Sequence, residues 1–502
     1  MKSVNQVKIG IILSYILIAF NAIYSLFITP YMIQCLGDDE YGVYKTIGSL
    51  TASLIVIDLG IGGTVQRFVA KYIAEKKEDK ISNFAAMNFI QAAFLSFILI
   101  VVCIGLFFTI EPTYSGTFND FYLQTAKRVF IIMSASIVFQ FFGDVANGII
   151  IGYNHFVFGN GIKLVKLILR VILVYVLLVR FREAETLALI DLVLTIAVIV
   201  VQHFYISLKL RLKIKLSHWD QSVFFEMGKY TILMFLTTLV AQVNSNVDNI
   251  IVGAISGPSF VSVYSIGLLF FSMFQNISGA VSGVMLPTVT NALALPNGEK
   301  RVVEIIIQAG RFQFMLIGAG IVGFICIGRE FIEVWLGDDY SDAYLISLIL
   351  VIPSIFELCV NVCLSILRAQ NRLVFRTVAI SISTVINIII TIFAVTHWSY
   401  IGAAIGTAVS YVGCSLIAMN IYYVKVIRLP MMQIYKGIVK GLFTCQIISG
   451  TALYFVSRLF RGSYIDIGIK IGFFCIVYSI CLVAFGLNTK EKKQIPIIKH
   501  II

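Results

Sequence analysis

Residues 82–110 read SNFAAMNFIQAAFLSFILIVVCIGLFFTI and contain no charged side chain. A helix of about 20 apolar residues crosses the hydrocarbon core of a bilayer, so this stretch predicts a transmembrane helix. Similar runs follow one another through the chain and leave no gap for a soluble domain. We expect spans near residues 7–34, 39–70, 82–111, 122–150, 158–180, 184–208, 224–255, 258–292, 301–327, 341–367, 373–395, 400–427, 434–458 and 463–487.

The composition agrees with this pattern. The chain of 502 residues is 59% hydrophobic and 13% charged, whereas soluble domains contain nearer 25% charged residues. The sequence therefore predicts an all-α, polytopic membrane protein with about 14 transmembrane helices. Cys359 and Cys363 are the only cysteines close in sequence, with no CxxC motif and no histidine at metal spacing. We expect the cysteines to be small buried apolar residues, and we expect no metal site.

The basic residues are distributed unevenly over the loops. Of the 38 lysines and arginines, 28 lie in the amino-terminal segment or on loops after even-numbered spans, and nine lie on the other side. Basic loops stay in the cytoplasm, so both chain ends are expected there. The net charge of +12 is thus explained by topology and by attraction to anionic membrane lipids, and we expect no nucleic-acid partner.

Two pairs of short stretches repeat at nearly the same offset. Residues 36–44, LGDDEYGVY, resemble residues 256–264, SGPSFVSVY, after the first and seventh spans. Residues 152–158, GYNHFVF, resemble residues 369–375, AQNRLVF, after the fourth and tenth spans. The matches predict two six-helix lobes in parallel repeat plus two C-terminal helices. Transporters with this layout bind substrate between the lobes and rock about that site.

The repeat divides the chain into four parts. These are an N-terminal six-helix lobe (1–208), a cytoplasmic linker (209–223), a C-terminal six-helix lobe (224–427), and a terminal helix pair with a basic cytoplasmic tail (428–502). Residues 208–216, LKLRLKIKL, alternate cations with aliphatic side chains. This alternation is compatible with a strand, and we favour a linker that lies on anionic head groups.

Several local patterns carry a family resemblance that extends over essentially the whole chain. They are Gly37, Tyr41, Gly42 and Tyr44; Asp58-Leu59-Gly60 with Arg67 and Lys71; Asp248-Asn249-Ile250-Ile251-Val252-Gly253; Val263-Tyr264-Ser265; Met285-Leu286-Pro287; and Trp335-Leu336-Gly337. Together they resemble the polysaccharide transporter branch of the multidrug/oligosaccharidyl-lipid/polysaccharide exporter superfamily. The first span lacks the arginine-bearing start of peptidoglycan-precursor flippases, which counts against that sub-branch.

The resemblance implies a flippase of the bacterial inner membrane. Such proteins move undecaprenyl-pyrophosphate oligosaccharides from the inner to the outer leaflet by alternating access, for synthesis of surface polysaccharides such as O-antigen or capsule. The implied partners are the lipid-linked oligosaccharide, membrane lipids, and a glycan polymerase and glycosyltransferases. No cofactor is implied.

Five cations are candidates for binding the pyrophosphate. Lys163, Lys166 and Arg170 are three and four residues apart, which places them on one face of a helix. Arginine and lysine are natural partners of pyrophosphate, although the two lysines could instead extend to the membrane interface. Arg67 and Arg311, near predicted inner helix ends, are either interface anchors or parts of the same cavity.

Acidic residues within the spans could couple transport to protons or sodium. Asp58 and Asp248 are the main candidates, because both lie in polar segments. Asp144, Asp191 and Glu357 are further intramembrane acids. For each of them the alternative is a structural role, either a hydrogen-bond network or an ion pair with a basic neighbour.

Two other functions fit parts of the sequence. A cation-coupled antiporter of small amphipathic molecules would share the fold, and a membrane glycan polymerase would be an enzyme. The cationic stripe of residues 163–170 favours the flippase. The predicted external loops are short, and the sequence contains no P-loop, HExxH or GxSxG motif, so we expect no catalytic residues.

Overall fold

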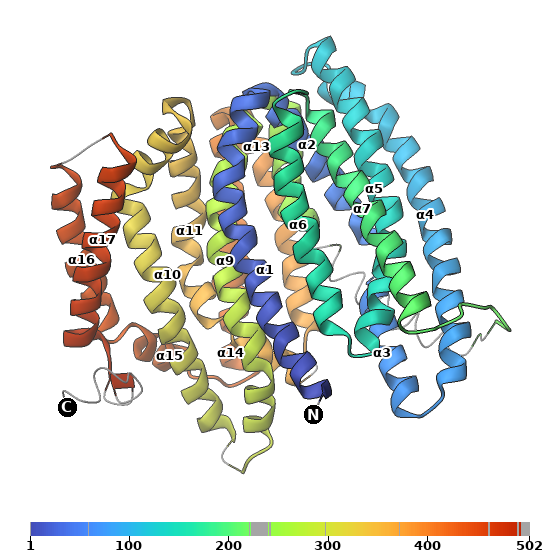
Figure 1. Ribbon diagram of the computed structural model, residues 1–502. Coiled ribbons are helices and arrows are strands. Elements are labelled where there is room, and N and C mark those ends of the chain that lie inside the picture. The colour runs from blue at the N-terminus through green and yellow to red at the C-terminus, as the bar shows by residue number, and fades with distance from the viewer. Residues whose placement is uncertain are drawn as a thin grey trace. The chain divides into compact units, whose positions relative to one another are not determined.

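The computed structural model describes residues 2–58, 60–219, 221, 239, 242–296, 298–370, 372–459, 462–488 and 491–492 (Figure 1). These residues form helices and connecting turns, and no strand occurs among them. Thirteen of the expected spans coincide with helical residues. Of the seventh, 224–255, residues 239 and 242–255 are helical, and residues 224–238 and 240–241 lie outside the described residues. The all-α, polytopic fold class is confirmed.

The exact number of spans remains a prediction. By length and hydropathy, nine helices in the described ranges can cross a membrane, or ten if one pair bent by 43° is a single span. Two helices explain much of the difference. Helix α6 (Phe156–Leu178) is apolar, but it contains three cations and is therefore not among the nine. Helix α13 (Val374–Tyr411) joins two expected spans across a kink at Trp398 and Ser399, where Ser399 has φ 51°.

The chain divides into two compact units. Unit 1 comprises Met1–Ser262 with Val395–Ala403, and unit 2 comprises Val263–Ala394 with Ala404–Ile502. The domain boundaries expected from the repeat remain predictions.

Unit 1 is arranged around helix α5 (Asp120–Gly152), which packs against five other helices of this unit. The other labelled helices of this unit are α1 (Lys2–Leu36), α2 (Asp38–Leu54), α3 (Ile61–Ala74), α4 (Glu78–Tyr114), α6 and α7 (Ala184–Leu208). Small residues allow close approach of α5 to α3, because a Cβ on Gly152 would lie 2.7 Å from Val69.

The second expected span is broken in its middle. After α2 the chain forms a 3-10 turn, η1 (Ile55–Asp58), and Gly60 adopts φ 68° immediately before α3. A left-handed conformation is accessible to glycine without a side-chain clash. The break places the carboxyl group of Asp58 at the amino end of α3.

Unit 2 contains the remaining helices. They are α9 (Pro258–Leu293, whose first residues belong to unit 1), α10 (Gly298–Leu336), α11 (Asp342–Val360), α12 (Cys363–Ala369), α13 (whose residues 395–403 belong to unit 1), α14 (Met419–Lys425), α15 (Met431–Val439), α16 (Leu442–Ser457) and α17 (Tyr464–Cys481), with short helices η2 (Asp338–Tyr340), η3 (Val412–Ala418) and η4 (Leu482–Gly486).

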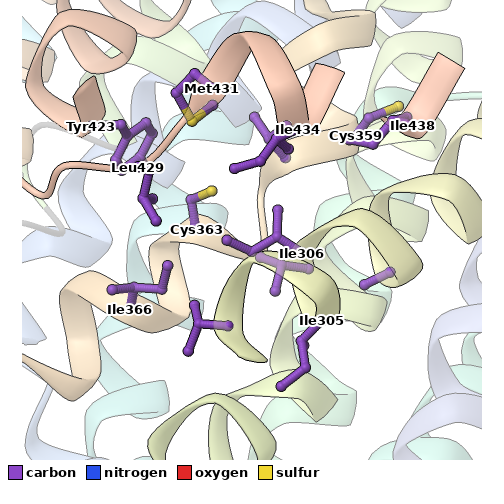
Figure 2. Close-up of a cluster of buried hydrophobic side chains, with 14 of the residues drawn as sticks. Ile305, Ile306, Cys359, Cys363, Ile366, Tyr423, Leu429, Met431, Ile434 and Ile438 are labelled. Atoms are coloured by element: carbon purple, nitrogen blue, oxygen red, sulfur yellow. The ribbon is translucent and has the colours of Figure 1, made fainter. Parts of the chain in front are cut away.

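The buried cluster in Figure 2 joins α10, the α11–α12 region and α15. Cys359 and Cys363 belong to this cluster together with Ile306 and Ile434, and both thiols are free. The expectation of buried apolar cysteines is confirmed for this pair, while Cys475 is exposed.

The basic linker after α7 forms neither helix nor strand along residues 211–219. Its backbone is held by the start of α4: Asn83 Oδ1 accepts hydrogen bonds from the amides of Ser217 and His218, at 2.7 and 3.1 Å. The side chains of Lys213 and Lys215 are exposed.

Candidate functional site

The cations of α6 face polar residues of α7 in a regular antiparallel register. Arg170 lies opposite Asp191, and Lys166 lies opposite Thr195, so each pair is separated by one helical turn from the next. The short connection of residues 179–183 makes α6 and α7 antiparallel neighbours, and it fixes this register.

Arg170 is held by a network of three helices. Its Nε and Nη2 donate to the two oxygens of Asp191, at 2.6 and 3.0 Å, which is the bidentate geometry that arginine favours with carboxylates. The guanidinium also donates to the hydroxyls of Tyr24 on α1 and Tyr44 on α2. Arg170 and Asp191 retain 19% and 29% exposure of their side chains, so the pair is partly buried. A pyrophosphate at this guanidinium would have to compete with Asp191.

The two lysines of the stripe are differently placed. Lys166 Nζ donates to the neutral hydroxyl of Thr195 at 2.9 Å, and Lys163 is exposed one turn earlier. In the described part of the chain neither lysine forms an ion pair, although the charges of both act on the carboxylate of Asp144 on α5. These two ammonium groups are therefore the cations of α6 that can take up an anion without breaking a direct salt bridge.

An apolar groove of about 550 Å³ lies beside Lys166, between α6 and α7. Its wall includes Val165, Leu169 and Val198. Among the residues that line it, Lys166 is the only lysine, and there is no arginine, aspartate or glutamate. At one end, Tyr205 stacks on Phe158 with ring centroids 3.6 Å apart.

The hydroxyl of Tyr205 lies 2.6 Å from Nδ1 of His155, in the turn before α6. Burial lowers the pKa of His155, and the positive charge of Lys209 lowers it further. The neutral imidazole is therefore favoured at this end of the groove.

Asp58 and Asp144 form an acidic pair across the broken second span. Their carboxylates interact electrostatically, and the backbone amides of Gly60 and Ile61 hydrogen-bond to Asp58. One oxygen of Asp58, Oδ1, is buried without a hydrogen-bond partner in the described ranges. The amide contacts support a structural role at the start of α3, while the free oxygen leaves room for a proton, so ion coupling through Asp58 stays a prediction.

Asp248 is buried in the helical residues 242–255, with 3% exposure. One turn of this helix contacts α2 directly: Asn249 Nδ2 donates to Ser49 Oγ at 2.8 Å, and a Cβ on Gly253 would meet Thr46 at 2.7 Å. This packing supports the hydrogen-bond network that was the alternative for the seventh span. A role of Asp248 in coupling remains untested.

Arg311 and Arg67 occupy different surroundings. Arg311 is 4% exposed and pairs with Glu491, at 2.7 and 3.0 Å. It also donates to the carbonyls of Gly437, Lys440 and Gly486. These contacts support the anchoring role for Arg311. Arg67 is exposed in the middle of α3, and its contribution to a binding site stays a prediction.

Sequence reasoning did not identify Tyr24 and Tyr44, whose hydroxyls complete the Arg170 network. It also missed a tyrosine that hydrogen-bonds to an intramembrane carboxylate in unit 2. There, Tyr411 of α13 donates to the carboxylate of Glu357, on which the charge of Arg376 also acts. Asp144 and Lys163 are nineteen residues apart, and so are Glu357 and Arg376. This equal spacing between an acid and a base in each half was a usable signal.

Comparison with known proteins extends these observations. Residues 35–345 match the family described as "Polysaccharide biosynthesis protein". The protein named "Putative O-antigen transporter" of Salmonella typhi is 21% identical over 408 residues, which cover 78% of this chain and 90% of that protein.

The fold is similar to those of solved transporters. The lipid II flippase MurJ in an inward closed conformation superposes with a TM-score of 0.70 at 18% identity, covering 93% of this chain and 98% of that one. An inward-facing multidrug resistance MATE family transporter of the MOP superfamily gives 0.63 at 14% identity, covering 84% and 99%. The matched family, the fold and the apolar helices lead to one conclusion: the chain is a multi-pass membrane protein that belongs to the polysaccharide transporter family.

Proposed function

We propose that this protein is a flippase that moves an undecaprenyl-pyrophosphate oligosaccharide from the inner to the outer leaflet of the bacterial plasma membrane by alternating access. The observation that carries the proposal is the pair of ammonium groups of Lys163 and Lys166, which form no ion pair within the described ranges; Lys166 lines an apolar groove, and Lys163 lies one turn away. A lipid-linked glycan combines the two corresponding features, an anionic phosphate group and a long hydrocarbon chain.

The chemistry of the site favours binding without bond cleavage. Lysine is a mobile point charge that can follow a phosphate group, whereas Arg170 is fixed by a planar bidentate contact to Asp191. We therefore assign the first contact with the pyrophosphate to the lysines. Arg170 joins only if Asp191 is displaced from it.

The experiment is flipping of a lipid-linked oligosaccharide in proteoliposomes, read by access of an external lectin to the glycan. Lys166→Gln removes one charge-assisted contact, worth about 1.5–3 kcal/mol, and should weaken substrate affinity roughly 10- to 100-fold. Arg182→Gln is the matched control, because it removes one exposed cation just beyond the other end of α6. Equal affinity in the wild type and in Lys163→Gln/Lys166→Gln would contradict the proposal.

Orientation and partners are part of the same proposal. With both chain ends cytoplasmic, reporter fusions after Gln34 and after Asn154 should signal from opposite sides of the membrane. The flipped glycan must be supplied by glycosyltransferases on one side and consumed by a polymerase on the other.

A cation-coupled antiporter is the second candidate, favoured by the acidic pair of Asp58 and Asp144. Proton and sodium gradients separate the two functions. An antiporter stops without a gradient, whereas an uncoupled flippase runs at the same rate with and without one, also in Asp58→Asn and Asp248→Asn.

A further inference from the structure

The groove between α6 and α7 has the form of a site for a hydrocarbon chain rather than for a sugar. Its volume of about 550 Å³ lies within the range of ligand pockets, about 300–1,000 Å³. The side chains that line it are aliphatic or aromatic except for Lys166 and the hydroxyl of Tyr205. A sugar would leave its hydroxyls without partners along such a wall.

The groove is open along its length. Val165, Leu169 and Val201, which line it, are 53%, 43% and 47% exposed. At Gly161 an added Cβ would meet no atom within 4 Å, so the wall is recessed there. Given the ~30 Å³ that a water-sized group occupies, the groove holds roughly 18 carbon atoms, which is between three and four isoprene units.

The charge of an attached head group determines which hydrocarbon chain binds in the groove. Within a bilayer an apolar chain gains little from leaving the lipid, because lipid tails are as apolar as the groove. Selectivity must then come from a charged group attached to the chain. Lys166 lines the groove and Lys163 lies one turn away, so a chain in the groove brings a phosphate group attached to it to these ammonium groups.

We propose that this groove binds the phosphate-proximal isoprene units of a polyprenyl pyrophosphate, with the pyrophosphate at Lys166 and Lys163. The inference rests on the proposed function and adds a binding site for the lipid chain within unit 1. Gly161 and the small Ala197 leave room in the walls for the methyl branches that distinguish a polyprenyl chain from a straight acyl chain.

The test is photolabelling, which does not require transport. A polyprenyl pyrophosphate with a photoreactive group in its second isoprene unit should label peptides of α6 and α7 in the purified wild-type protein. Gly161→Leu adds a side chain to the groove wall where a Cβ meets no atom within 4 Å, and it improves helix propensity, so the variant should fold and lose this labelling. Gly105→Leu on α4, where an added Cβ also meets no atom within 4 Å, should label like the wild type.

Competition identifies the ligand. Unlabelled polyprenyl pyrophosphate should abolish the labelling, whereas phosphatidylglycerol at the same concentration should not. Equal competition by phosphatidylglycerol, labelling elsewhere in the wild type, or full labelling of Gly161→Leu would each overturn the inference. Groove labelling in a protein that moves no glycan would instead refute the proposed function and leave the binding site standing.

Discussion

Replacing Asp191 tests whether the Arg170 guanidinium serves the substrate or only the fold. In the structure, Asp191 occupies two of the donors that a phosphate would use, at 2.6 and 3.0 Å. Asp191→Asn keeps one acceptor and removes the negative charge. The substrate would then displace one charge-assisted hydrogen bond fewer, worth about 1.5 kcal/mol, which corresponds to roughly tenfold tighter binding.

The same change must weaken the folded protein. Breaking a fully buried ion pair costs about 3–5 kcal/mol and breaking an exposed one costs about 0–1 kcal/mol. With side chains 19% and 29% exposed, and with Tyr24 and Tyr44 still accepting from the guanidinium, we expect about 2 kcal/mol for Asp191→Asn. If Arg170 binds both Asp191 and the substrate, Asp191→Asn should therefore lower the melting temperature and tighten substrate binding.

The assay is substrate titration in proteoliposomes, combined with thermal unfolding of the same preparations. Arg170→Lys keeps a charge and loses the planar fork, and Arg170→Ala loses both, so affinity should fall in that order. If Asp191→Asn folds and binds with unchanged affinity, and if Arg170→Ala also binds like the wild type, then Arg170 has no contact with the substrate.

Three further predictions concern stability, each read by thermal unfolding. Arg311→Ala should lower the free energy of unfolding by about 3–5 kcal/mol, because it leaves a carboxylate and three carbonyls without their donor. Transport per folded molecule should stay unchanged. A small loss of stability with abolished transport would contradict the anchoring role. Gly42→Ala should cost more than about 3 kcal/mol, since its Cβ would lie 1.8 Å from a backbone oxygen. Gly63→Ala, within α3 and with open space around the added Cβ, should not destabilise and should gain up to about 1 kcal/mol from helix propensity; similar losses for both would refute the close packing. Since burial and Lys209 lower the pKa of His155, stability should be constant above about pH 6.5 and decrease as the pH falls below it, and His155→Gln should remove this component.

The sequence was sufficient for the helices and for the polar residues that need partners. Bilayer thickness limits each span to a narrow range of lengths, so apolar runs located the helical segments of the described ranges, while the count of fourteen spans stays a prediction. The break near Asp58 was not predicted, because a single glycine with positive φ interrupts a stretch that remains apolar on both sides.

The partners of the charged residues were only partly predictable. Asp191 was expected either to pair with a base or to couple ions, and the short turn before α7 would have identified Arg170 as the base through the antiparallel register. No such reasoning could reach Glu491, which pairs with Arg311 across 180 residues of chain. Long-range pairs depend on how the helices pack, and hydropathy carries no information about that.

The ion pair of Arg170 and Asp191 within the membrane has an electrical consequence. It carries no net charge, so moving it through the membrane field does no electrical work. A potential of 100 mV acts with about 2.3 kcal/mol on each uncompensated charge. Among the α6 cations, the field acts mainly on Lys163 and Lys166, and a bound pyrophosphate cancels their charge. Voltage should therefore distinguish the empty protein from the loaded one.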